Sequence, residues 1–282
     1  MIRIRTARAS LLAALLLPGL ATAAGLNDTG ITQCAAYYEN NLTCPQDGFP
    51  LQDAETGRDA QQTAGSLSKA GGGSAGFDFT KLGADGNVLA IQNGTWDAEG
   101  SEEAGTKWSC VRDNVTGLIW EIKTDNDPPD LHDKDWTYTW YNSDPYTNGS
   151  TDPTANNNTG NGAGSQGDST SCGLTLMQCN TEAYAEAVNA AGLCGYSIGW
   201  RMPTMNELLS IVDYSSVNPA IDVAYFPNTP GVYHWSASPS YLFYWEAWGV
   251  DFTAVGVDYI PKSGWGGDPL AAGTVRLVRG GE

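Results

Sequence analysis

The chain has 282 residues, with 14 basic against 32 acidic side chains and a formal net charge of −18 at pH 7. Nucleic acid and anionic membrane surfaces repel so acidic a protein, so the composition argues against both as partners. The length is sufficient for one large domain or two small ones.

The N-terminus has the three parts of a secretory signal peptide. Three arginines lie within the first eight residues, an apolar run covers 11–17, and a small-x-small cleavage site covers 21–23. A membrane span needs roughly 20 apolar residues, so an uncleaved anchor is the weaker alternative. We predict a signal peptide over residues 1–23 and a mature chain that is secreted, periplasmic or on the cell surface, without membrane insertion.

Residues 24–107 are predicted to be an N-terminal extension that precedes the main domain or packs on it. The segment 61–76 is rich in Gly, Ser and Ala, which is typical of a flexible linker. The stretch 76–82 alternates as a strand does, and the run 88–91 after a turn at 84–87 is its expected partner.

Residues 108–282 form the predicted main domain, of the α+β class. Residues 110–121 predict two strands joined by a turn, and the Asn- and Gly-rich stretch 142–171 predicts a surface insertion. Helices are expected at 180–191 and 205–213. Further strands are expected at 232–236, 244–252, 255–260 and 274–279. This order indicates a mostly antiparallel sheet flanked by two helices.

All six cysteines follow the predicted signal peptide, which favours three disulfides in an oxidising compartment. Sequence alone does not fix their connectivity. There is no C-x-x-C spacing for a zinc site. Local spacing favours the pairs Cys34–Cys44, Cys179–Cys194, which would clamp the first helix, and, for the remaining two, Cys110–Cys172.

The sequence WRMPTMNELLSIVDY predicts the start of the second helix. Thr204 and Glu207 have the spacing of a capping box, and Pro203 prevents the helix from extending backwards. We interpret Trp200 as a core residue. Arg201 is interpreted as the partner of a buried ion pair or of backbone carbonyls.

This stretch, together with CVRDNVTGLIWEIKT, PAIDVAYFPNT, YHWSAS and VRLVRGG, resembles the bacterial Lcl C-terminal domain family from residue 110 onward. The resemblance implies a secreted, disulfide-stabilised domain with a C-type-lectin-like fold, long loops and two short helices. Formylglycine-generating enzymes share that fold. The family's namesake is a trimeric adhesin module similar to binders of sulfated glycans. Such binding requires clustered Lys and Arg, and this acidic chain does not favour it.

Aromatic side chains in the last third of the chain are the predicted ligand contacts. Exposed Trp and Tyr rings stack on sugars or anchor protein contacts, and about half of the rings on an alternating strand face away from the core. The alternative is that most of them are core residues. The candidates are Trp265, Trp248, Tyr244 and Tyr241.

The predicted metal ligands are Asp125, Asp127 and Asp130, whose hard oxygens suit calcium, the one cofactor that the sequence favours. They lack the EF-hand spacing, and the alternative is a solvated acidic loop. No catalytic residue is predicted. The pattern GYSIG around Ser197 matches a nucleophile elbow in letters, but a helix precedes it where a strand is required.

The leading hypothesis is a non-catalytic binding or adhesion module for a glycan, a surface polymer or a protein. One alternative is a structural subunit of an envelope or filament assembly, which would form homo-oligomers. Another is a formylglycine-generating-type oxidase, which needs a free cysteine pair near the end of the domain. No cysteine follows Cys194, which argues against that chemistry.

Overall fold

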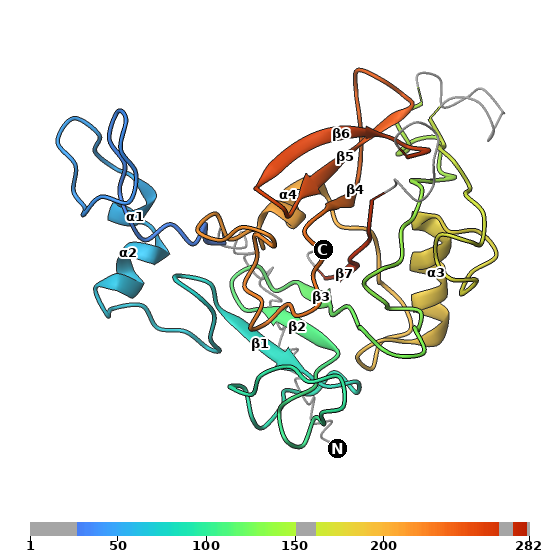
Figure 1. The fold of residues 1–282 in the computed structure, drawn as a ribbon, viewed down its shortest axis with the longest axis horizontal. Coiled ribbons are helices and arrows are strands. Elements are labelled where there is room, and N and C mark those ends of the chain that lie inside the picture. Colours follow the sequence, from blue (N-terminus) through green and yellow to red (C-terminus); the bar gives the residue numbers. More distant parts are fainter. Residues whose placement is uncertain (1–26, 151–161, 265–272, 281–282) are drawn as a thin grey trace, which may run out of the picture.

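The computed structural model describes residues 27–150, 162–264 and 273–280, so the predicted signal peptide lies outside the described residues. Within these ranges the chain forms two antiparallel sheets, four short helices and three disulfides (Figure 1). The α+β class with antiparallel sheets is therefore confirmed. The main domain contains the two predicted helices, and the other two helices lie in the N-terminal extension.

The first sheet has the strand order β1-β2-β3-β7, with every neighbouring pair antiparallel. Its edge strand β1 comes from the predicted extension and pairs along its whole length with β2. The strands predicted at 76–82 and 110–121 are thus present. The bounds are β1 Phe79–Leu82, β2 Cys110–Asp113, β3 Ile119–Glu121 and β7 Val278–Arg279.

The strand predicted at 274–279 is shorter than expected because the two ends of this segment pair with different sheets. Thr274 forms a parallel bridge with His234, on the second sheet, whereas Val278 pairs with Trp120 on the first. This segment therefore connects the two sheets at the centre of the molecule.

The second sheet is an antiparallel meander of the strands β4, β5 and β6. A register shift between Trp235 and Pro239 interrupts the pairing of β4 with β5, whereas β5 and β6 pair without interruption. The bounds are β4 Tyr233–Pro239, β5 Glu246–Asp251 and β6 Gly256–Pro261.

The two predicted helices start where their caps indicate. Helix α3 (Thr181–Ala191) begins after Asn180, whose Oδ1 accepts from the backbone N–H of Ala183 at 2.9 Å. Helix α4 (Met205–Leu209) ends four residues before the predicted end. Its last turn is closed by the Ser210 hydroxyl, which donates to the carbonyl of Glu207 at 2.7 Å and so competes with helix continuation.

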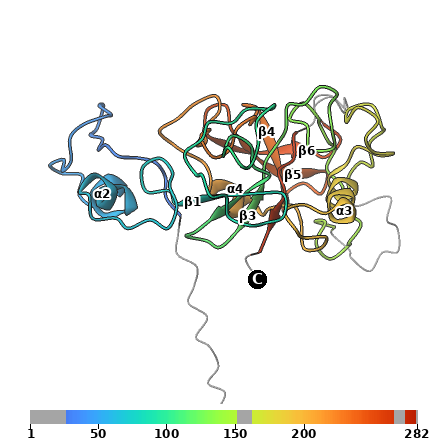
Figure 2. The same ribbon diagram turned by 90° about the horizontal axis from the view of Figure 1, so that it is seen from below.

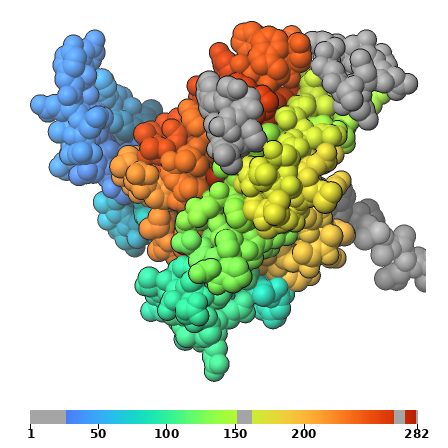
Figure 3. Space-filling model, turned by 45° about the vertical axis from the view of Figure 1, so that its right-hand side comes forward, coloured from blue at the N-terminus to red at the C-terminus, as the bar shows by residue number. Residues whose placement is uncertain are grey.

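Two further helices, α1 (Asp53–Thr56) and α2 (Arg58–Thr63), lie in the N-terminal lobe, which we define as residues 27–76. They have four and six residues, too few for a helical repeat of apolar positions to show in the sequence. Helix α2 also occupies the start of the segment predicted to be flexible. Figures 2 and 3 show this lobe standing out from one side of the molecule.

Cys34 pairs with Cys44 as predicted, but the other two predicted disulfides are wrong. The observed pairs are Cys110–Cys194 and Cys172–Cys179. A helix of 11 residues such as α3 spans about 16 Å, whereas disulfide-bonded Cα atoms lie no more than about 7 Å apart. Cys179 and Cys194 flank opposite ends of α3, so they cannot form the predicted clamp.

Two aromatic-rich cores fill the molecule. One lies among the first sheet, α4 and the end of β5, and includes Trp108, Trp120 and Phe226. The other packs α3 against the second sheet through Tyr184 and Trp235. Residues of the first sheet alternate between the two cores, so both of its faces are buried, whereas the side of β5 and β6 that carries Trp248 and Tyr259 remains partly open to solvent or a ligand.

Candidate functional site

The outer face of the second sheet carries a row of aromatic rings, which we call the aromatic strip. Each ring touches the next: Tyr244 lies 4.8 Å from Trp245, Trp245 5.1 Å from Phe243, Phe243 5.9 Å from Tyr259, and Tyr259 5.4 Å from Trp248, all between ring centroids. Tyr241 lies next to them in the connection between β4 and β5. The strip is defined by Tyr241, Phe243, Tyr244, Trp245, Trp248 and Tyr259.

The alternation of β5 and β6 explains why Trp248 and Tyr259 face outward. Ala247 pairs with Ile260, and both are buried in the core behind the sheet. Their neighbours Trp248 and Tyr259, also directly paired, must then point to the opposite face. A cross-strand aromatic pair of this kind also stabilises the hairpin.

The connection between β4 and β5 is fixed by its own hydrogen bonds. The backbone N–H of Phe243 donates to Ser240 Oγ at 3.2 Å, and that of Glu246 donates to the carbonyl of Phe243 at 3.0 Å. The backbone N–H of Ser240 donates to the carbonyl of Glu246 at 2.9 Å. The rings at the end of the strip therefore sit on a turn with a defined conformation.

The strip is open to solvent. Tyr241 is 98% exposed, Trp245 49% and Tyr244 38%, whereas Trp248 is half-buried. Of the predicted contacts, Tyr244 and Trp248 belong to this row of touching rings, Tyr241 lies in the same connection three residues before Tyr244, and Trp265 lies outside the described residues. The prediction omitted Trp245, Phe243 and Tyr259, since its choice of rings did not use the strand register.

A cleft of about 190 Å³ adjoins the strip, between Tyr244, Trp245 and residues 162–165. Its floor contains the buried Lys262, whose Nζ donates to the carbonyls of Asn148, Gly162 and Tyr244 at 2.8, 2.5 and 2.7 Å. Burial lowers the pKa of Lys262 to about 8. With all three donors in use, this ammonium group holds the loops together rather than offering a charge to a ligand.

A larger cleft, of about 400 Å³, lies between α3 and the segment 200–202. Arg201 and Asn189, which line this cleft, are already bonded within the protein. Arg201 makes two bonds to the Glu207 carboxylate, at 2.7 and 2.8 Å, and Asn189 bonds the backbone N–H and carbonyl of Trp200. Thr204 and Glu207 form the capping box, with Pro203 just before it. The conspicuous motif thus builds local structure.

The predicted calcium ligands are not brought together. Asp130 accepts from Thr124, Asn126 and the backbone of His132, and Asp125 lies 3.4 Å from Lys134 Nζ. Among the described residues, the acidic side chains that do converge are Asp28, Asp53 and Asp59, in the N-terminal lobe.

A buried ionic network, which the sequence did not reveal, joins β3 to its surroundings. Glu121 is fully buried, and its Oε1 accepts from Tyr184 OH, from His132 Nδ1 at 2.8 Å and from Lys123 Nζ at 3.2 Å. Its Oε2 accepts from the backbone N–H of Leu277 at 2.8 Å. The carboxylate therefore connects β3, α3, the loop at residue 132 and the segment that crosses between the sheets.

The electrostatics of Glu121 follow from these partners. Burial by itself would raise the pKa of this carboxyl, but the charge of Lys123 and the hydrogen bonds from His132 and Tyr184 outweigh it, so the pKa lies below its ordinary value. A carboxylate sealed from solvent and fully hydrogen-bonded has no access to a substrate. We therefore treat it as structural.

Comparison with known proteins identifies a family for most of the chain. The sequence profile of the Lcl C-terminal domain matches residues 109–279. No curated protein and no solved structure matches the chain. Among the described residues, no helix is both long and apolar enough to cross a membrane.

Proposed function

The chain belongs to the Lcl C-terminal domain family, and from that membership we propose a secreted, non-catalytic module that binds a neutral glycan on its aromatic strip. The fold we propose is C-type-lectin-like, which the two antiparallel sheets, short helices and disulfides support. The observation that carries the functional proposal is the unbroken row of ring contacts that runs from Tyr244, in the connection before β5, to Trp248 on the outer face of β5.

Sugar rings have apolar faces that stack on aromatic rings, and Tyr and Trp combine such a face with a hydrogen-bonding end. The strip offers Trp245 and Tyr241 at its exposed end, and a tyrosine hydroxyl at Tyr244 beside the small cleft. Tyr244 and Trp245 contact neighbouring rings and stand on a bonded turn, so little of their side-chain freedom is lost when a ligand binds.

The charge of the molecule favours a neutral ligand over a sulfated one. The predicted mature chain has 11 basic against 32 acidic residues, a net charge of −21. Beside the strip, the lining of the small cleft contains one basic side chain, Lys262, and three backbone carbonyls occupy its ammonium group. Binding of a polyanion would instead require several free cations.

The cysteine pairing supports a binding module over an oxidase of the formylglycine-generating type. All six cysteines are in disulfides. Such an oxidase requires two free thiols, and the last cysteine of the chain, Cys194, is bonded to Cys110.

A glycan array with the mature protein tests the proposal. Trp245→Ala and Tyr241→Ala should each weaken binding to the glycan that the wild type selects. Central aromatic contacts contribute about 2 kcal/mol, so we expect a loss of at least about tenfold. Tyr146→Ala is the matched control, because Tyr146 is an exposed tyrosine that lies outside the strip.

Thermal unfolding should show that the variants remain folded, since surface substitutions usually change stability by less than about 0.5 kcal/mol. Undiminished glycan binding by both strip variants would refute the site. A wild-type protein that binds no neutral glycan on the array would refute the proposed ligand class.

A further inference from the structure

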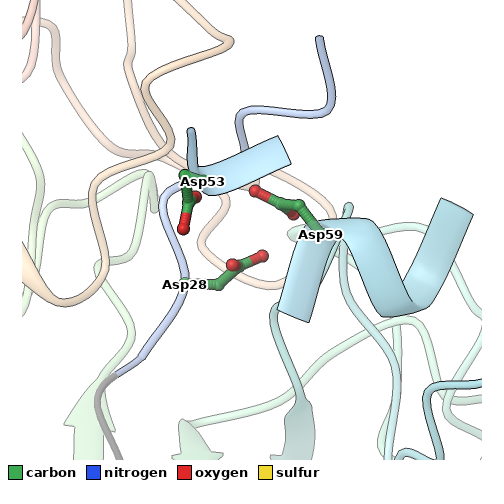
Figure 4. Close-up of side chains that lie close together, drawn as sticks. All are labelled: Asp28, Asp53 and Asp59. Carbon is green, nitrogen blue, oxygen red and sulfur yellow. The ribbon is translucent and has the colours of Figure 1, made fainter. Parts of the chain in front are cut away.

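Three carboxylates converge in the N-terminal lobe, outside the matched family domain. Asp28 precedes the lobe's disulfide loop, Asp53 is the first residue of α1, and Asp59 lies in the first turn of α2. One oxygen of each lies within 4.8 Å of the others. Figure 4 shows the three side chains pointing toward one another from three different segments.

Two of these carboxylates are almost entirely removed from water. Asp59 is 0% exposed and Asp28 is 6% exposed. Asp59 Oδ1 accepts from the backbone N–H of Gly76 at 2.8 Å, but Asp59 Oδ2 and Asp28 Oδ2 are buried without a hydrogen-bond partner. Buried carboxylate oxygens without partners are costly, and each such group calls for an explanation.

No side-chain cation in the described part of the chain neutralises the cluster by direct contact. The ion pairs among the described residues involve other carboxylates. Arg58, the neighbour of Asp59 in sequence, has its Nη2 4.0 Å from Asp78 Oδ2. Asp53 Oδ2 accepts from the hydroxyl of Thr29 at 2.5 Å, which orients this carboxylate without neutralising it. Three negative charges thus face one another with two oxygens unpaired.

We propose that Asp28, Asp53 and Asp59 bind a calcium ion that fastens the N-terminal lobe. Hard carboxylate oxygens are the ligands that Ca²⁺ prefers, at about 2.3–2.6 Å, so its opposite ligands lie about 5 Å apart. The three oxygens lie within 4.8 Å of one another, close enough for one such ion to bind all three. The flexible coordination of Ca²⁺ suits this irregular set of ligands better than the strict octahedral geometry of Mg²⁺.

The position of the cluster explains what the ion would do. Asp28 lies on the segment that joins the lobe to the rest of the molecule. On one side of it, Asn27 Nδ2 donates to Asp113 Oδ2 of β2 at 2.6 Å. On the other side, the carbonyl of Thr29 accepts from the backbone N–H of Tyr214 at 2.8 Å. An ion shared with α1 and α2 ties both helices to this junction. Helices of four and six residues have little intrinsic stability, so a shared ligand stabilises them.

The alternative occupant is a proton. Without an ion, burial together with the adjacent Asp28 raises the pKa of Asp59 to about 8, so the carboxyl pair would share a proton near neutral pH. A proton and a calcium ion are distinguished by whether added Ca²⁺ changes the protein at constant pH.

The test uses the full mature chain, treated with a chelator and then dialysed. Calorimetric titration with Ca²⁺ at pH 7 should show one site, with a dissociation constant of about 1 mM or tighter, as in extracellular calcium modules. Saturating Ca²⁺ should raise the melting temperature. Asp59→Asn should weaken Ca²⁺ binding at least tenfold, and Asp125→Asn, in the other acidic cluster, should bind as the wild type does.

If Asp59→Asn does not fold, Asp53→Asn, at a partly exposed position, replaces it with the same expectation. A wild-type protein that binds no Ca²⁺ in the titration overturns the proposal and assigns the cluster to a shared proton. An equal response to Mg²⁺ overturns the assignment of calcium. Neither result affects the aromatic strip, because the strip lies on the second sheet, outside the N-terminal lobe, and its test measures glycan binding.

Discussion

Replacement of the buried Glu121 by glutamine should be among the most destabilising isosteric changes in the molecule. Glutamine has the same shape, but one carboxylate oxygen becomes an NH₂ group. Oε2 accepts from the N–H of Leu277, and Oε1 accepts from Lys123, His132 and Tyr184. Whichever way the amide turns, its NH₂ group faces another donor, and Lys123 loses its buried counter-charge.

The magnitude follows from the burial of the pair. Removing one partner of a buried ion pair costs about 3–5 kcal/mol, because the remaining charge is left uncompensated. Lys123 and Glu121 are only 2% and 0% exposed at their side chains, so water cannot replace the missing partner. For a chain of this size, that cost corresponds to a fall in melting temperature of roughly 5–9 °C.

Urea denaturation at pH 7, followed by tryptophan fluorescence with the disulfides intact, measures the loss. Glu186→Gln is the matched control, because Glu186 lies on the exposed face of α3 and should change stability by less than about 0.5 kcal/mol. The depressed pKa of Glu121 adds a pH test: the wild type should lose the carboxylate's contribution as the pH falls below the ordinary value of 4.5, and Glu121→Gln should not. A loss below about 1 kcal/mol at pH 7 would refute the structural role of the network.

Two further predictions concern the covalent frame and the acid limit of stability. Replacement of both Cys110 and Cys194 by serine removes a cross-link between residues 84 apart in the chain. The chain-entropy relation gives a loss of ~4.5 kcal/mol in the free energy of unfolding, measured by urea denaturation, and a loss below ~2 kcal/mol would contradict it. Burial and the charge of Arg276 lower the pKa of His234 to about 3 from 6.5, so the unfolded chain binds more protons between these values and stability falls as the pH drops through them. His234→Phe should therefore show a shallower fall in the free energy of unfolding between pH 7 and about pH 4, by up to about 1.4 kcal/mol per pH unit; an unchanged slope would exclude His234 as the cause.

Features encoded in a few adjacent residues were predictable from the sequence. The caps at Asn180 and Thr204 place the starts of α3 and α4. Alternation and turn residues located β4, β5 and β6 to within a few residues. In each case the deciding hydrogen bond or burial pattern spans only a few positions, so the local sequence contains it.

Features that depend on distant residues were not predictable. The partners of Cys110 and Glu121 lie up to 156 residues away in the chain. A cysteine or a glutamate in a predicted strand does not by itself indicate which distant residue it will contact. The aromatic strip is an intermediate case. The density of rings after residue 235 indicated an exposed aromatic surface, but the choice of outward rings required the pairing of Ala247 with Ile260.

The pairing of β1 with β2 bears on any attempt to produce the family domain by itself. The profile match begins at residue 109, yet β2 forms its edge ladder with Phe79–Leu82, 30 residues upstream in the predicted extension. A protein shortened to that boundary would leave unpaired the backbone groups of β2 that now bond to β1. These groups could then pair with a strand of a neighbouring molecule. Recombinant fragments that start before residue 76 should therefore stay dispersed, whereas shorter ones should self-associate.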